Sequence, residues 1–60
     1  PMPITEIDRI RIHGDLEQLG ELVSRKQALW QGTNDQAAKA ELETEMAGHM
    51  ELMNQLKAQL

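Results

Sequence analysis

The stretch Gly32-Thr33-Asn34-Asp35-Gln36 decides the fold of this 60-residue chain. Glycine is common as the C′ residue, immediately after the last turn of a helix. Thr33 followed three residues later by Gln36 has the spacing of a capping box, which begins a helix, and Asn34 or Asp35 can cap in its place. We therefore predict that one helix ends here and another begins, with a turn at residues 32–34.

The residues before this turn have the apolar spacing of an amphipathic helix over about residues 4–31. Thr5 followed by Asp8 resembles a helix start. Apolar residues then recur within an arc of roughly 140° on one side of the helix. A heptad series within this arc, which we call the first seam, occupies positions 12, 16, 19, 23, 26 and 30 and includes Lys26.

One segment of the first half leaves an alternative open. Ile10-Arg11-Ile12 alternates as a strand does, and Gly14 follows shortly after. Residues 7–14 are therefore either part of the first helix or a short strand or separate helical turn.

The residues after the turn predict a second helix over about residues 35–60. Its heptad series, the second seam, occupies positions 42, 46, 49, 53, 56 and 60 and includes His49. A buried, neutral histidine requires a hydrogen-bond partner, and we expect Asp15 of the other helix to supply it. Acid is then expected to charge His49 and to loosen the assembly.

Two arms of about 26 residues, each roughly 39 Å long, joined by a short connection, predict an all-α fold. The arrangement is an antiparallel helical hairpin that forms a single domain over residues 1–60. Reflection of the chain about residue 33 predicts which residues face each other. The predicted pairs are Trp30 with Gln36, Val23 with Leu42, Leu19 with Met46, Leu16 with His49, and Ile12 with Met53.

The composition excludes several classes of protein. The chain has no cysteine, so it has neither a disulfide framework nor a thiolate zinc site. Its net charge of −4 disfavours nucleic acids and anionic membranes as partners. No apolar run reaches the length of a membrane span. We expect a small acidic protein of the cytoplasm.

A two-helix hairpin of this size, without a disulfide or a metal, is not expected to be stable alone. The simplest remedy is a homodimer that forms a four-helix bundle. Gly20 and Gly48 either permit close helix approach or are tolerated surface residues. The residues expected at the oligomer interface are Leu16, Leu19, Val23, Trp30, Leu42, Met46, Met53 and Leu56.

The function that this pattern favours is protein–protein interaction, as a small regulator, adaptor or inhibitor without a catalytic site. Residues that flank the seams are expected to contact an unidentified protein partner: Ile7, Ile10, Met50 and Leu52. Trp30 either packs at the turn or anchors a partner, since tryptophan is enriched at binding hot spots.

Three alternative functions use other residues. A dimer that gathers Arg9, Arg11, Arg25 and Lys26 into one patch would be a nucleic-acid-linked regulator. Met46, His49 and Met53 share one helix face, beside Met50, and thioether and imidazole ligands suit a soft metal such as Cu(I). A methionine-rich packing face is the stronger interpretation, so we predict neither metal nor cofactor. The weakest alternative is a tautomerase-like enzyme that uses the amine of Pro1 as a base.

Overall fold

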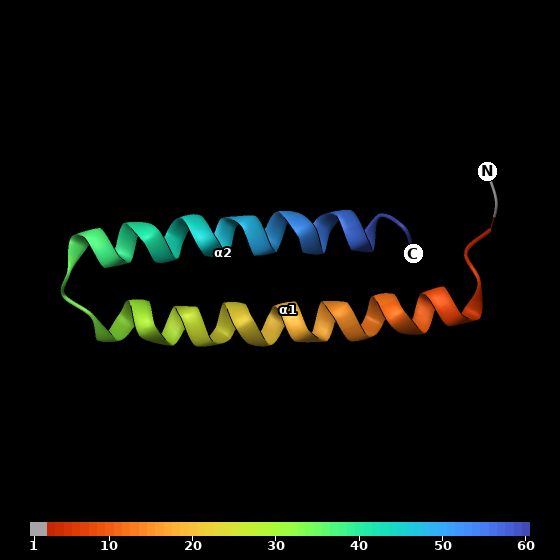
Figure 1. Ribbon diagram of the computed structural model, residues 1–60, viewed down its shortest axis with the longest axis horizontal. Helices are drawn as coiled ribbons and strands as arrows, with labels where there is room; N and C mark the ends of the chain where they lie inside the picture. Colours follow the sequence, from red (N-terminus) through yellow and green to blue (C-terminus); the bar gives the residue numbers. More distant parts are fainter. Residues whose placement is uncertain (1–2) are drawn as a thin grey trace.

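The computed structural model describes residues 3–60 and contains two helices that lie side by side in opposite directions (Figure 1). Helix α1 spans Glu6–Gly32 and helix α2 spans Gln36–Lys57. The prediction of an all-α helical hairpin is confirmed. The strand alternative for residues 7–14 is wrong, because α1 runs through this segment without interruption.

Helix α1 begins at the predicted cap. Thr5 is extended and its hydroxyl oxygen accepts a hydrogen bond from the backbone N–H of Asp8, at 3.1 Å. Glu6 and Asp8 place negative charge in the first turn, where the helix dipole favours it. The hydrogen bond with the Thr5 side chain lowers the pKa of Asp8 below its ordinary value of 3.8, and the nearby Arg11 guanidinium lowers it further.

The turn differs from the prediction in two details. Gly32 is the last residue of α1, and the extended Thr33 ends the helix without a left-handed residue, so a C′ glycine is the wrong assignment. The side chain of Asp35 caps α2 by accepting from the N–H of Ala37 at 3.0 Å. Thr33 instead accepts from the N–H of Asp35 at 3.2 Å. The capping alternative that names Asp35 is therefore the correct one.

Both seams face the contact between the helices. Ile12 is the one fully buried side chain among residues 3–60, with 1% of its surface exposed. The other first-seam positions and positions 42–56 of the second seam are half-buried. Leu60 lies beyond the end of α2 and is exposed, so the second seam ends one position earlier than predicted. A contact along one edge leaves the molecule flat, with Cα extents of 47 × 18 × 9 Å.

The register of the helices is shifted from the predicted reflection. Lys26 contacts Glu45 and His49, and the ammonium of Lys39 lies over the ring of Trp30. Reflection about residue 33 places Lys26 opposite Ala40 and Trp30 opposite Gln36, so the predicted pairs are wrong by about one turn. Part of the shift lies in the turn, because the connection covers residues 33–35, and a reflection about its centre, residue 34, moves each pairing by two residues.

Close helix approach at the two mid-helix glycines is not present in the hairpin. A Cβ atom built on Gly20 or on Gly48 meets no atom within 4 Å. Both glycines therefore border open space, and the alternative of tolerated surface glycines is the one the structure supports for the contact between α1 and α2.

Helix α1 is longer than α2, with 27 residues against 22. At about 1.5 Å per residue the difference is roughly 7 Å. Figure 1 shows that α1 extends beyond the C-terminal end of the chain. Ile7 and Ile10 lie on this segment, and 79% and 64% of their surfaces are exposed. We call this segment of α1, which carries Ile7 and Ile10, the α1 overhang.

Candidate functional site

The eight residues predicted for the oligomer interface all lie along the contact between α1 and α2. Each is half-buried within a single chain, so part of its surface already packs inside the hairpin. They are Leu16, Leu19, Val23, Trp30, Leu42, Met46, Met53 and Leu56. What remains of their surface is available to a neighbour only along the two broad faces of the hairpin.

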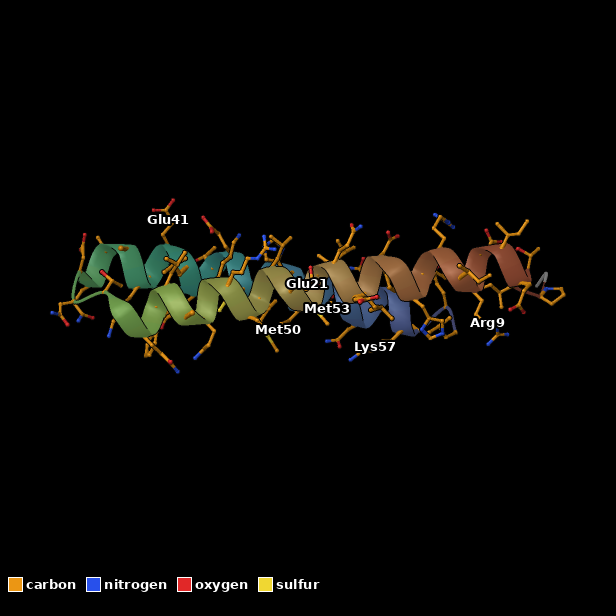
Figure 2. All side chains as sticks on the ribbon, turned by 90° about the horizontal axis from the view of Figure 1, so that it is seen from below. Arg9, Glu21, Glu41, Met50, Met53 and Lys57 are labelled. Carbon is orange, nitrogen blue, oxygen red and sulfur yellow. The ribbon has the colours of Figure 1, made fainter. Side chains whose placement is uncertain are left out.

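The four residues predicted for partner binding are all exposed, but the structure does not bring them together. Ile7 and Ile10 lie on the α1 overhang. Met50 points away from the side of the hairpin on which Glu41 lies, as the edge-on view in Figure 2 shows. Leu52 lines a groove with Leu22 of α1. The predicted set therefore divides among three surfaces.

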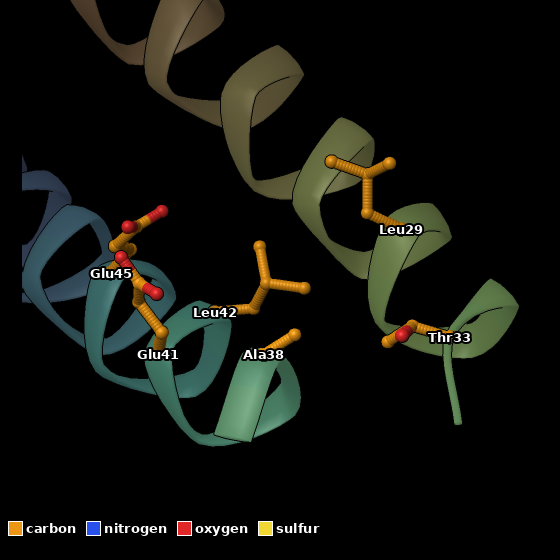
Figure 3. Close-up of a pocket in the computed structure, with 6 residues that line it drawn as sticks. All are labelled: Leu29, Thr33, Ala38, Glu41, Leu42 and Glu45. Atoms are coloured by element: carbon orange, nitrogen blue, oxygen red, sulfur yellow. The ribbon is translucent and has the colours of Figure 1, made fainter. Parts of the chain in front are cut away.

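Apolar side chains of both helices meet on one broad face of the hairpin. This face carries two grooves. Leu29, Ala38, Leu42 and polar neighbours line the first (Figure 3), and Leu19, Leu22, Leu52 and Leu56 line the second. Leu22 and Leu29 are seven residues apart, about two helical turns, so both grooves open on the same side. We call this surface the leucine face; its members are Leu19, Leu22, Leu29, Leu42, Leu52 and Leu56.

Three leucines of this face project into solvent. The exposed fractions are 38% for Leu22, 62% for Leu29 and 45% for Leu52. Leu22 and Leu29 fall in the predicted apolar arc but outside the first seam, so heptad spacing did not assign them to an interface. Their seven-residue spacing beside the seam was the available signal.

Polar groups from both helices meet at the centre of the hairpin. The ammonium nitrogen of Lys26 lies 2.8 Å from Nε2 of His49 and 3.0 Å from a carboxylate oxygen of Glu45. A lysine ammonium has no acceptor, so it donates to both, and Nε2 of a neutral His49 must carry the lone pair. The prediction that Asp15 is the hydrogen-bond partner of His49 is wrong, because Asp15 lines the second groove of the leucine face.

The structure does not favour the metal and nucleic-acid alternatives. Lys26 occupies Nε2 of His49, and residues 3–60 contain no group of three or more His, Cys, Asp or Glu side chains that could hold a metal ion. Lys26 is turned into the seam, and Arg11 pairs with Asp8 at 3.4 Å. Arg9 and Arg25 are 16 residues apart on one helix, or about 24 Å.

Trp30 packs at the turn end of the hairpin. It is half-buried, and the ammonium of Lys39 lies 4.3 Å from the centre of its ring, within the range of a cation–π contact. Its indole Nε1 is buried and has no hydrogen-bond partner within residues 3–60. Within a single chain, Trp30 therefore packs at the turn, as the first of the two interpretations predicted.

Pro1, on which the enzyme alternative depends, lies outside the residues that the structure describes. Within the described part of the chain, neither helix is long and apolar enough to cross a membrane. Comparisons with protein-family models, with curated proteins and with solved structures find no match to this chain.

Proposed function

We propose that this chain is a small non-enzymatic protein–protein interaction module, a regulator, adaptor or inhibitor that acts in the cytoplasm as a homo-oligomer. One observation carries the proposal. The hairpin fully buries Ile12, while large apolar side chains of both helices stay in solvent. A cytoplasmic location agrees with a cysteine-free sequence.

The energetics of a two-helix unit support this function. Ordering the backbone costs about 1–2 kcal/mol per residue, and burial of apolar surface is the main term that offsets it. Covering an exposed leucine contributes about 1.5–3 kcal/mol. A protein partner that covers several such leucines therefore stabilises the hairpin at the same time as it binds.

The chain offers two separate apolar surfaces for such contacts. The leucine face runs along both helices, whereas the α1 overhang presents Ile7 and Ile10 from one helix only. Two surfaces on one small chain suit a module that joins copies of itself to a second protein. Grooves and helix faces of this kind are a common mode of recognition between helical proteins.

Site-specific photo-crosslinking in the cells that make the protein tests the proposal. We expect a photoreactive residue at Ile10 or Leu29 to give covalent products with protein, because both positions are exposed and apolar. The same residue at Glu21, an exposed polar position of α1, serves as the control and is expected to give none. Products of equal yield at all three positions, or no products, contradict the proposal.

A further inference from the structure

We propose that a second copy of this chain covers the leucine face, with a twofold axis parallel to the long axis of the hairpin. In this arrangement α1 of each copy lies over α2 of the other, and the two turns lie at the same end. The inference rests on the proposed function, because it takes the exposed leucines to be contact residues, and it names the partner of that surface.

The size of the face matches a second copy. The broad side of the hairpin measures 47 × 18 Å by its Cα extents. A parallel axis leaves the α1 overhang uncovered, so the two copies overlap over a projected area of roughly 700 Å² each. Stable protein–protein interfaces bury about 800 Å² per partner. The two grooves lie at different positions along the hairpin, so a partner must be about as long as the hairpin to fill both.

Charge is distributed unequally between the two edges of the face. Glu41 and Glu45 lie beside the first groove on the α2 edge. Arg25 shares with Leu29 and Thr33 a groove on the α1 edge. The contact between Lys26 and Glu45 fixes the positions of these groups along the long axis of the hairpin, which we call their height. Arg25 is adjacent to Lys26, so it lies at the same height as Glu45. At this position along the hairpin, the α1 edge carries the cation of Arg25, with Glu21 one turn away, and the α2 edge carries Glu41 beside the Glu45 that pairs with Lys26.

This distribution selects the orientation of the second copy. A twofold axis parallel to the hairpin places Arg25 of each copy opposite Glu41 and Glu45 of the other, so opposite charges meet twice. A twofold axis across the hairpin places α2 over α2 and brings the acidic edges together. Like charges at an interface oppose association, so the parallel axis is favoured.

The side chains fit this orientation. At the height of Leu29, α2 presents Ala38 and Leu42, which border the first groove. Gly48 lies three residues after Glu45 and four before Leu52, and these spacings place all three on one side of α2. The space above Gly48 is open. Leu29 of the second copy therefore faces the first groove, and Leu22 faces the gap at Gly48.

Charge reversal tests the arrangement in purified full-length protein. Arg25→Glu makes both charge contacts of the homodimer repulsive, and Glu41→Arg replaces the attraction between Arg25 and position 41 by repulsion in both contacts. We expect each variant to raise the dissociation constant about tenfold or more, measured by sedimentation equilibrium at low salt over a hundredfold concentration range. An equimolar mixture of the two variants restores both attractive contacts and is expected to dimerise with nearly the affinity of the original chain.

Each test variant on the leucine face has a matched control variant elsewhere on the chain. Glu51→Arg makes the same charge change as Glu41→Arg at an exposed position away from the face, and we expect no change in affinity. Leu22→Glu is expected to raise the dissociation constant more than tenfold, whereas Met50→Glu on the opposite side leaves it unchanged. All of these side chains are exposed in a single chain, and circular dichroism verifies that each variant keeps its helices.

Several outcomes overturn the inference. These are a helical monomer at every concentration, no recovery of affinity in the mixture, and a dimer that Met50→Glu weakens but Leu22→Glu does not. A purified monomer that still crosslinks to another protein through Leu29 in cells overturns this inference and the homo-oligomer, and leaves the protein–protein interaction role standing. A purified dimer whose crosslinks in cells contain only this chain supports the inference and contradicts the adaptor role.

Discussion

Ile12 shows how little of this chain one hairpin can shield from water. Removing most of the Ile12 side chain leaves a cavity that the surrounding residues fill only partly. We expect Ile12→Ala to lower the free energy of unfolding by about 2 kcal/mol or more in urea titrations at fixed protein concentration. Ile10→Ala, at a position that is 64% exposed, is expected to change it by less than about 0.5 kcal/mol. Equal effects of the two substitutions contradict the assignment of Ile12 to the core.

The seams identified Lys26 and His49 as polar residues among apolar ones, but the sequence did not identify them as partners. The reflection that paired residues was centred on residue 33, whereas the helices meet about one turn further along α2. Heptad spacing determines which side of a helix faces its neighbour. It leaves the sliding of one helix along the other undetermined, and the geometry of residues 33–35 sets that offset.

At the scale of the elements, the first turn of α1 depends on the charge of Asp8. The hydrogen bond with the Thr5 side chain, followed by the charge of Arg11, lowers the pKa of this carboxyl below 3.8 in the folded chain. A lowered pKa in the folded state means that the stabilisation is present above pH 3.8 and is lost as the pH falls through the folded value. We expect Asp8→Asn to remove this part of the acid dependence.

The free energy of unfolding, measured for both chains between pH 5 and pH 2, checks this expectation. The difference in the free energy of unfolding between the original chain and the Asp8→Asn variant should become smaller as the pH falls below 3.8. The carboxyl chemical shift of Asp8 provides a direct titration. A difference that stays constant down to pH 2 means that the charge of Asp8 does not stabilise the helix.

Helix α1 also contains a glycine that its packing does not require. Because open space surrounds Gly20, the structure predicts that Gly20→Ala raises the free energy of unfolding by about 0.8–1 kcal/mol through helix propensity. Gly14→Ala, at another open position of the same helix, should give a similar gain. Thermal and urea unfolding measure both effects, and a loss of stability in the Gly20 variant alone would restore the hypothesis of close approach there.

The helix boundaries were predictable where a side chain caps a helix and less so elsewhere. Thr5 begins α1 through the contact with Asp8 that its spacing indicates. At the turn, three adjacent polar residues compete, and Asp35 caps α2 because its carboxylate reaches the N–H of Ala37. Gly32 permits a left-handed end but does not require one, and the extended Thr33 ends α1 in its place.

At the scale of the whole molecule, we expect the two halves of α1 to differ in local stability. Helix α2 lies along the second half of α1, whereas Ile7 and Ile10 on the overhang are largely exposed. In hydrogen exchange, amides of residues 9–11 should exchange faster than those of residues 19–26. Uniform protection along α1 would mean that another molecule covers the overhang.

Features that depend on spacing within one helix were predictable, and features that depend on the relative placement of two helices were not. The hairpin follows from local spacing, and Leu16, Val23 and Met53 all occupy the half-buried positions that heptad spacing assigned to them. The leucine face depends on the register of two helices and on their relative rotation. Leu22 and Leu52 become neighbours only once both are fixed, so single-helix patterns could not pair them.

The flatness of the hairpin and the difference between its two broad sides have a consequence for the size of the proposed assembly. In the proposed dimer, the leucine face of each copy covers that of the other, so neither leucine face remains free to bind a third copy. A chain with such a face on both broad sides would continue to add copies and form a fibre. The placement of most leucines on one broad side therefore favours a closed dimer over a polymer.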